Sequence, residues 1–578
     1  MLSAEVQRIG LLIGLAATGY LMILAWNDDF LQSHPAQPYA STPDLQPLVS
    51  DAVVDPAAPS IPQNSMESDV PDASLIAQSE PAQSSTAPAV SPGALSSTER
   101  LIRVKTPHLN VWIDRLGGDI VRVELPKFPV SLEQPDVPFQ LLDNGRGHTY
   151  IAQSGLAGAD GVDAQAQRPL YRANASEFRL TGTEPLQVDL KATVGNQDVL
   201  KRYEFQPDGY LVDLSYQVDN RESRPIQASL FAQIKRDAKD PPSAATGFSM
   251  GPKPYVGGAL TTVDDRYEKV EFDDLDEGPY RASVEGGWIA FLQHYFLSAW
   301  VADPEVSNNY YGQKRNDGTY VFGYTGPLKT IAAGGQGHWR TQFYAGPKDQ
   351  KKLGLIAPNL NMTVDYGFLW WLAEPLFSLL DWLHGIVNNW GVAIILLTLL
   401  VKLVLFPLSA ASYKSMANMR RVQPKMKRLQ ERYADDRQKL SQEMMSFYKK
   451  EKVNPLGGCL PMLLPMPIFI ALYWVLFESV ELRQAPFFLW INDLAAMDPF
   501  FILPLLMGGS MFLTQMMSPA VGDPMQVKMM KMMPIMFTVL FLFFPAGLVL
   551  YWLVNNVLGV AQQYYVIRKT EREQAAAG

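Results

Sequence analysis

The sequence predicts a polytopic α-helical membrane protein with six spans and one large β-sandwich domain outside the membrane. Two observations predict this class. One apolar stretch near the N-terminus and five after residue 365 are long enough to approach the thickness of a bilayer. Between them, apolar and polar residues alternate as they do in half-buried strands. Charged residues make up only 19% and the net charge is −9, which excludes a disordered chain and a basic nucleic-acid binder.

The first predicted element is a membrane anchor within residues 1–26. The stretch from Ile9 to Trp26 carries no charge, and at about 1.5 Å per residue it nearly crosses a hydrocarbon core of about 30 Å. A cleavable signal peptide is the alternative, but its apolar region is usually shorter and ends at an A-x-A-like site, which this sequence lacks. We therefore predict an uncleaved signal anchor whose N-terminus lies in the cytoplasm.

The composition of residues 27–100, which are acidic and rich in Pro, Ser and Ala, predicts a disordered linker. They contain 11 prolines, ten acidic residues and one arginine, with few apolar clusters. Such a segment cannot bury enough apolar surface to offset the entropy lost on folding. A tether is the simpler interpretation, and a binding motif for a partner is the alternative.

The alternation of apolar and polar residues over 101–347 predicts one large β-sandwich. After the turn formers Gly117 and Gly118, the apolar residues of the stretch 121–125 alternate with Arg and Glu. The same period of two runs from Val212 to Val218. Long polar loops, such as 235–243, argue against a barrel of spanning hairpins.

Five apolar stretches after Asp365 predict the remaining spans. They are residues 392–408, 460–477, 500–517, 532–544 and 548–565. The first two are joined by residues 408–457, which carry twelve Lys or Arg and five acidic residues, whereas residues 478–499 carry four acidic residues and one Arg. Because positive loops stay inside, we predict that 408–457 and both termini are cytoplasmic and that the β-domain lies across the membrane.

Two further helical elements flank the first of these spans. Residues 366–388 are apolar and rich in Trp, with Glu374, Ser378 and Asp381 on one narrow stripe, which predicts a helix in the outer interface of the membrane. A tilted extra span is the alternative.

The second element is a cytoplasmic hairpin. Residues 410–453 repeat apolar side chains every three or four positions, which predicts a helical hairpin with a basic outer face. That face is either simply solvated or a dock for anionic lipid, a ribosome or a nascent chain.

No motif for covalent or metal-dependent catalysis occurs in the chain. The phosphate-binding loop, the H-E-x-x-H pair and the G-x-S-x-G elbow are all missing, and the six histidines have no ligand spacing. The single cysteine, Cys459, excludes an internal disulfide and a multi-cysteine metal site. We therefore predict a protein that is not an enzyme and that needs no cofactor or metal.

Lys402 is the candidate functional residue, because it is an ionisable group inside a predicted span. Thr398, Lys402 and Ser409 are spaced to share one helical face. A charge within a span costs roughly 2.5–3.5 kcal/mol on insertion scales, so such a residue is a functional hypothesis by default. The alternative is that Lys402, near the inner boundary, simply extends its amine to the headgroups.

Polar residues on two other predicted spans complement Lys402. Ser510 and Thr514 share a face of one predicted span. One side of the last span carries Trp552, Asn555 or Asn556, Gly559, and Gln562 or Gln563. Such residues often only hold a helix bundle together. Several that converge on one cation would instead form a wet cavity open to the cytoplasm.

Four motifs, in this order, resemble the YidC family of membrane protein insertases. They are NPLGGCLP (454–461), MPIF (466–469), VELRQAPF (480–487) and FPAGLVLYW (544–552). The resemblance covers about 366–567 closely, and the anchor, linker and outer β-domain match the layout of the Gram-negative form of the family. It implies a five-span insertase core over residues 389–567, a periplasmic β-supersandwich and a short cytoplasmic tail over 568–578.

The resemblance also implies a hydrophilic groove that is closed to the periplasm and open to the cytosol and lipid. Lys402 stands where the family usually has an arginine; lysine keeps the charge but lacks the bidentate fork. Thr398, Tyr551 and Trp552 fall on positions that the resemblance associates with substrate contact. With Ser510, Thr514, Asn555 and Gln562 they form the predicted groove.

The predicted function is insertion and folding of inner-membrane proteins in a bacterium, alone or with the Sec translocon. The expected partners are nascent membrane proteins, the translocon and its accessory subunits, the phospholipid bilayer and, through the basic hairpin, the ribosome; no nucleic acid is expected. A secondary transporter with a polar midplane site is the alternative, although the five core spans show no internal repeat. A membrane-tethered, sugar-binding enzyme is a third interpretation of the β-domain, supported by fold analogy alone.

Overall fold

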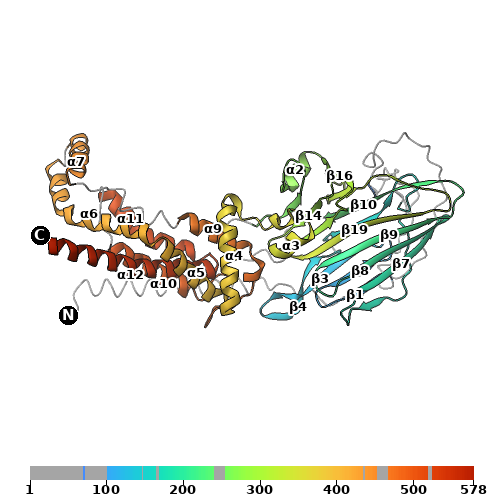
Figure 1. Ribbon diagram of the computed structural model, residues 1–578, viewed down its shortest axis with the longest axis horizontal. Coiled ribbons are helices and arrows are strands. Elements are labelled where there is room, and N and C mark those ends of the chain that lie inside the picture. Colours follow the sequence, from blue (N-terminus) through green and yellow to red (C-terminus); the bar gives the residue numbers. More distant parts are fainter. Residues whose placement is uncertain are drawn as a thin grey trace, which may run out of the picture. The chain divides into compact units, whose positions relative to one another are not determined.

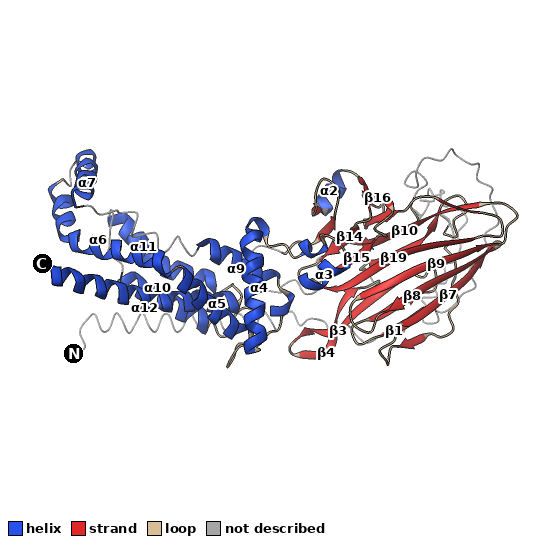
Figure 2. Ribbon diagram, in the orientation of Figure 1, coloured by secondary structure: helices blue, strands red, loops and turns tan. Residues whose placement is uncertain are grey.

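The computed structural model places the chain in a β-domain followed by a set of helices (Figures 1 and 2). It describes residues 69–71, 100–145, 147–163, 168–239, 254–433, 436–451, 466–517 and 524–577. The predicted anchor, most of the linker and the N-terminal part of the stretch 460–477 lie outside the described residues.

Two antiparallel sheets form the β-domain, with one parallel pair, β1 and β6, at an edge. The 11-stranded sheet follows the path β13 (Tyr280–Glu285), β16 (Ser307–Lys314), β17 (Tyr320–Thr325), β10 (Ile226–Arg236), β5 (Tyr150–Ala157), β3 (Ile120–Ser131), β2 (Asn110–Asp114), β1 (Leu101–Lys105) and β6 (Glu177–Arg179), with β18 (Lys329–Ile331) beside β10 and β4 (Gln134–Leu142) beside β3. The 8-stranded sheet follows the path β12 (Glu268–Val270), β11 (Gly257–Leu260), β14 (Trp288–Leu292), β15 (Phe296–Val301), β19 (Gln336–Pro347), β9 (Leu211–Asn220), β8 (Gln197–Phe205) and β7 (Leu186–Val194).

The two sheets share one hydrophobic core, as a sandwich requires. In β9 every second residue is buried, which confirms the alternation predicted from Val212 to Val218. The Gly117–Gly118 turn before β3 has positive φ at both residues, a backbone conformation that glycine adopts without strain. β5 differs, because all eight of its residues are buried. Both faces of this central strand must therefore be covered.

A buried polar network lies beside β5. Arg168 donates two hydrogen bonds to the Asp119 carboxylate, at 2.7 and 3.0 Å, and one to Asp163 at 2.7 Å. Lys201, fully buried, donates to the carbonyls of Gly117 and Ser154 at 3.0 and 3.1 Å. Burial lowers the pKa of Lys201 to about 7, while Asp119 acts in the opposite direction and Arg168 adds to the lowering. A buried charge of this kind makes the stability of the domain depend on pH.

We expect the β-domain to become more stable as the pH rises from 7 to 9. In this range Lys201 is largely neutral in the folded protein but still protonated in the unfolded chain, whose lysines keep their ordinary pKa of 10.5. The unfolded state then binds more protons, so the free energy of unfolding rises by up to about 1.4 kcal/mol per pH unit. Thermal unfolding of the full chain at pH 7 and pH 9 measures this. Lys201→Met should lack the rise, and an identical pH dependence in wild type and variant would contradict the assignment.

The helices that follow the β-domain are mostly apolar. They are α3 (Gln350–Ile356), α4 (Trp370–Val387), α5 (Trp390–Val404), α6 (Phe406–Arg432), α7 (Arg437–Glu451), α9 (Met466–Glu478), α10 (Ile502–Met516), α11 (Pro524–Phe541) and α12 (Ala546–Ala577), and the short α2 (Phe272–Glu277) lies within the β-domain. A second hydrophobic core joins α4, α5, α9, α10, α11 and α12.

The predicted span 392–408 is broken in the structure. α5 ends at Val404 and α6 begins at Phe406, and their axes differ by 67°. Pro407 lies in the first turn of α6, where its missing N–H and fixed φ suit the start of a helix and not its interior. The prediction that Ser409 shares a helical face with Thr398 and Lys402 is therefore wrong, because Ser409 belongs to α6.

Two of the apolar helices, α9 and α10, are short. Judged by length and composition, no single helix among the described residues is suited to cross a bilayer, and the bent pair of α5 with the first part of α6 passes the same test together. α12 extends to Ala577, so residues 568–577 continue the last helix.

The β-domain contacts the helical region through buried polar groups. Lys348, directly after β19, forms an ion pair of 2.7 Å with Glu478 at the end of α9, and both side chains are almost fully buried. His294 lies 2.8 Å from the carbonyl of Phe477. Arg483 donates to the carbonyls of Pro129 and Val130 at 2.7 and 3.2 Å. These contacts tie the ends of β3, β15 and β19 to the C-terminal end of α9 and to the segment that follows it.

Candidate functional site

The predicted groove residues lie on three helices. Thr398 and Lys402 are on α5, Ser510 and Thr514 are on α10, and Tyr551, Trp552, Asn555 and Gln562 are on α12. α12 packs against both α5 and α10, and also against α6. The last helix therefore lies at the centre of the candidate site.

Lys402 points its amine at α12. A Cβ built on Gly559 would lie 3.4 Å from Lys402 Nζ and 3.7 Å from the Tyr413 hydroxyl. The missing side chain of Gly559 thus leaves room for the lysine between α5, α6 and α12. Lys402 is half-buried, and no carboxylate of the described residues forms an ion pair with it. Within the described residues, the structure accordingly places a cation without an ion-pair partner where α5, α6 and α12 meet.

One side of α12 carries amides that reach the neighbouring helices. Asn556 Nδ2 donates to Ser510 Oγ at 3.1 Å, and Gln562 Nε2 lies 3.5 Å from the carbonyl of Phe406. Gln563 Nε2 contacts Met416 Sδ at 3.2 Å and the carbonyl of Met517 at 3.3 Å. The predicted groove includes Asn555 and Gln562. Their neighbours Asn556 and Gln563, which the sequence offers as alternatives, also contact other helices in the structure. The members of each pair are seven residues apart, which is about two helical turns, so the sequence places them on the same side of the helix.

The hydroxyl groups of the site are held by their own helices. Thr398 Oγ1 donates to the carbonyl of Ile394 at 2.7 Å, Ser510 Oγ to Met507 at 2.6 Å, and Thr514 Oγ1 to Ser510 at 2.9 Å. Thr398 and Ser510 are buried. Back-bonding of this kind satisfies a hydroxyl within an apolar helix bundle.

Tyr551 and Trp552 lie in an aromatic cluster with rings of α9 and α11. Trp552 meets Phe469 edge-on with ring centroids 4.5 Å apart, and it also packs on Phe537 and Phe541. Trp552 Nε1 is buried and has no partner within the described part of the chain, and the same holds for the Oε1 atoms of Gln562 and Gln563. Unpaired buried polar atoms on one helix are what a site that receives a polar ligand or water would leave.

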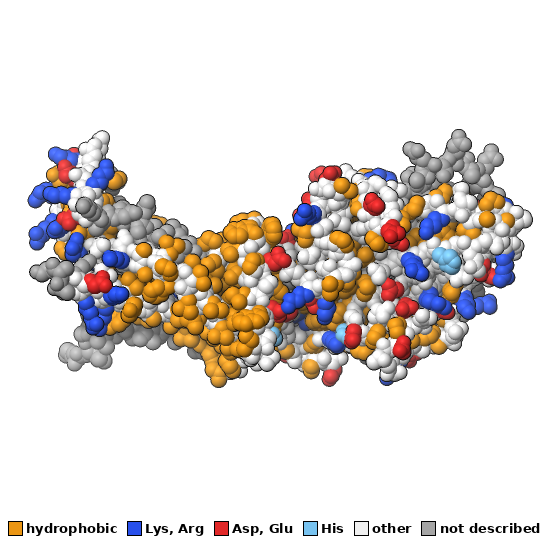
Figure 3. Space-filling model, viewed as in Figure 1, with side chains coloured by type: hydrophobic (Ala, Val, Ile, Leu, Met, Phe, Trp, Pro, Cys, Tyr) orange, Lys and Arg blue, Asp and Glu red, His pale blue; other side chains and the backbone are white. Residues whose placement is uncertain are grey.

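The surface of the helices is largely apolar (Figure 3). Lys and Arg gather instead over α6 and α7, at the end of the helical region in this view. α6 and α7 pack on each other through Met419, Val422 and Met426 with Phe447 and Tyr448. Residues 434 and 435, which connect α6 and α7, lie outside the described residues. This pair of helices presents the basic surface expected of residues 410–453.

Two family models match the chain, and together they cover most of it. The model described as "YidC periplasmic domain" matches residues 101–379, and the model "60Kd inner membrane protein" matches residues 382–574. Membrane protein insertase YidC of Pseudomonas putida (strain W619) is 50% identical over 571 residues, which is 98% of each chain. The chain belongs to the YidC family of membrane protein insertases.

A second relative agrees with this assignment. Membrane protein insertase YidC of Pseudomonas fluorescens (strain SBW25) is 47% identical and covers 99% of this chain and 100% of its own. Among solved structures, an active YidC insertase crystal structure with the first transmembrane domain resolved covers 81% of this chain and 93% of its own, at 19% identity and a TM-score of 0.37.

YidC membership confirms the predicted function. The chain is an inner-membrane protein insertase with a periplasmic β-domain, and it is not an enzyme. The substrates of such a protein are other membrane proteins. The assignment removes the support for a secondary transporter and for a sugar-binding enzyme. It leaves the roles of individual residues, among them Lys402, to be derived from the geometry.

Proposed function

We propose that this insertase spans the inner membrane six times, with both termini in the cytoplasm, and moves its clients through a hydrophilic groove between α5, α10 and α12. The polar segment that must cross the membrane enters this groove from the cytosol, where water lowers the cost of removing its charges from solution. Lys402 attracts acidic residues of that segment. The apolar segment of the client then slides into lipid, driven by burial of its apolar surface and aided by the membrane potential.

One observation carries this proposal. Lys402 is half-buried among apolar helices, its amine faces Gly559, and no described carboxylate neutralises it. A charge kept unpaired in such surroundings is expensive, because the desolvation cost is not offset by an internal partner. The amides of Asn556 and Gln562 add donors and acceptors on α12, the helix that the Lys402 amine faces. A client carboxylate is the ligand that would complete this arrangement.

Two other features support the proposed placement in the membrane. Trp370, Trp371 and Trp382 on α4 are each about 60% exposed, and exposed tryptophans are typical of membrane–water interfaces. We propose that α4 lies in the periplasmic interface. The basic surface of α6 and α7 would then meet anionic lipid or a ribosome with its nascent chain on the cytoplasmic side.

We propose that the Sec translocon is a partner for some clients and that others need only this chain. Reconstitution of the purified protein in liposomes, without translocon and without ATP, tests the second part. A short single-span client with an acidic tail is added, and protease protection of the tail is scored. Protection above that in empty liposomes supports autonomous insertion. Protection equal to that in empty liposomes would contradict it for this client.

A further inference from the structure

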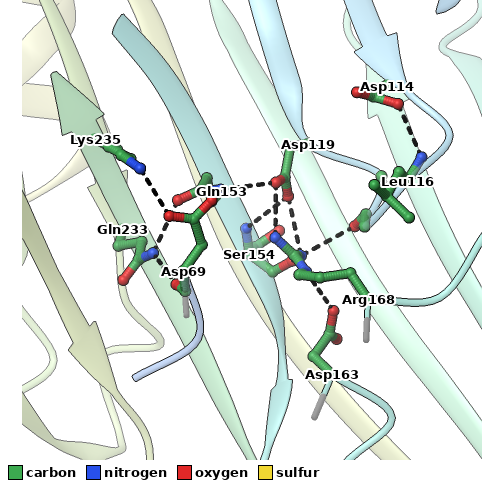
Figure 4. A network of polar contacts seen from close by, with 12 residues as sticks. Asp69, Asp114, Leu116, Asp119, Gln153, Ser154, Asp163, Arg168, Gln233 and Lys235 are labelled. Atoms are coloured by element: carbon green, nitrogen blue, oxygen red, sulfur yellow. Dashed lines mark hydrogen bonds and ion pairs between the residues drawn. The ribbon is translucent and has the colours of Figure 1, made fainter. Parts of the chain in front are cut away.

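A short piece of the linker lies against the β-domain. Asp69, Val70 and Pro71 belong to the predicted linker, yet Val70 is only 4% exposed and Pro71 is also buried. They contact the outer face of the 11-stranded sheet, over β5 and β10 (Figure 4). We call these three residues the strap.

The strap is held by charge and by hydrogen bonds at its acidic end. The Asp69 carboxylate forms an ion pair of 2.8 Å with Lys235 Nζ, which is also 3.1 Å from Asp317. The backbone carbonyl of Asp69 accepts a hydrogen bond of 2.7 Å from Gln233 Nε2. Burial acts to lower the pKa of Lys235, but the bonds to Asp69 and Asp317 and their charges raise it above its ordinary value. The lysine is therefore a charged partner for the strap.

An apolar floor receives the rest of the strap. Val70 packs with Ala157 of β5, Phe231 of β10 and Leu328. Phe231, Gln233 and Lys235 are alternate residues of β10, so they share one face of the strand, and Gln233 is paired across the sheet with Gln153. One face of β10 thus contacts the strap with three side chains in a row. The Phe231 ring meets the side chain of Val70, and the Gln233 amide and the Lys235 amine meet the carbonyl and the carboxylate of Asp69.

The strap also extends the buried polar network of Asp119 and Arg168, because Asp69 contacts Gln153, which contacts Asp119. Gln153 Nε2 lies 3.0 Å from the Asp119 carboxylate and 3.5 Å from that of Asp69, and Gln233 Nε2 donates to Gln153 Oε1 at 2.9 Å. A chain of polar contacts therefore runs from Asp69 through two glutamines to Asp119 and Arg168 (Figure 4). The strap helps to explain why β5 is buried on both faces.

We propose that residues 69–71 are a bound segment of the β-domain and not part of a free tether, and that Gln153, Gln233, Lys235 and Phe231 form the site that binds them. The ligand is an Asp-Val-Pro segment supplied by this chain itself. The linker then reaches the domain at a fixed point on the sheet, and only the residues before 69 connect that point to the anchor.

Thiol accessibility in the full-length protein tests the strap. With Cys459→Ser as background, Val70→Cys places one thiol on the strap itself, at a position that is buried against the sheet. The reaction of this thiol with a water-soluble maleimide reports how often the segment opens. We expect this thiol to react at least tenfold more slowly than the one from Val263→Cys, a position that is 85% exposed. Adding Asp69→Asn should speed the reaction about fivefold, since a partly exposed ion pair is worth that much. Lys235→Met should act in the same direction.

Asp55→Asn is the matched control, because it removes the same charge from the same linker; it should leave the rate at position 70 unchanged. Equal rates at positions 70 and 263 in the chain that keeps Asp69 would overturn the proposal. So would a rate at position 70 that neither Asp69→Asn nor Lys235→Met alters.

Discussion

Lys402→Ala should reduce the insertion of an acidic-tailed client at least tenfold in the liposome assay. The substitution removes the cation that faces Gly559, and an ionic hydrogen bond in a site of low polarity is worth roughly 1.5–3 kcal/mol. Lys402→Arg should keep most of the activity, because it keeps the charge. A client whose tail carries Asn and Gln in place of Asp and Glu should lose much less on going from wild type to Lys402→Ala.

Lys425→Ala is the control for a general loss of positive charge. Lys425 pairs with Glu451 on the hairpin, away from the candidate groove, and its side chain is mostly exposed. We expect it to insert this client nearly as well as wild type. If Lys402→Ala inserts the acidic client as efficiently as the unchanged protein, Lys402 serves only to place its amine among the headgroups.

Lys348→Met should cause the largest loss of stability of any single substitution considered for this chain. It leaves the Glu478 carboxylate buried without a partner at the contact between the β-domain and α9. Breaking a buried ion pair on one side costs roughly 3–5 kcal/mol, since the remaining charge stays in a medium that solvates it poorly. Thermal unfolding of the detergent-solubilised full chain measures the effect.

Two variants make this test specific. Lys348→Met with Glu478→Leu should recover much of the lost stability, because replacing both charges by apolar groups leaves nothing unpaired. Lys351→Met is the matched single control; Lys351 pairs with Asp381 on α4, but its side chain is 71% exposed, so its loss should cost about 1 kcal/mol or less. Equal melting temperatures for Lys348→Met and Lys351→Met would contradict the account.

The sequence predicts the β-domain well because its signals are local. Alternation with period two reports directly which residues of β9 face the core, and Gly117 and Gly118 mark a turn by their backbone alone. Family membership follows from long motifs in a fixed order. The positions of Lys402 and of the polar side of α12 also follow from helical spacing.

Other features depend on contacts between residues far apart in the chain, which spacing does not report. The break at Leu405 depends on Pro407 and on packing against α12, whereas the run of apolar residues over 392–408 by itself predicts one continuous helix. The aromatic cluster around Trp552 takes its rings from α9, α11 and α12. The strap is the clearest case. Its composition is typical of disorder, yet Asp69 finds hydrogen-bond partners 84 to 166 positions away in the chain.

The most direct test of the account maps where the acidic tail of a client lies during insertion. A photoreactive group is placed in the tail, the client is trapped on the reconstituted insertase, and the cross-linked residues are identified by mass spectrometry. The account predicts adducts around Lys402, on α5 and α12 near Thr398, Asn555 and Gln562. Adducts confined to the exposed outer residues of the same helices, such as Val404 and Val557, would contradict it.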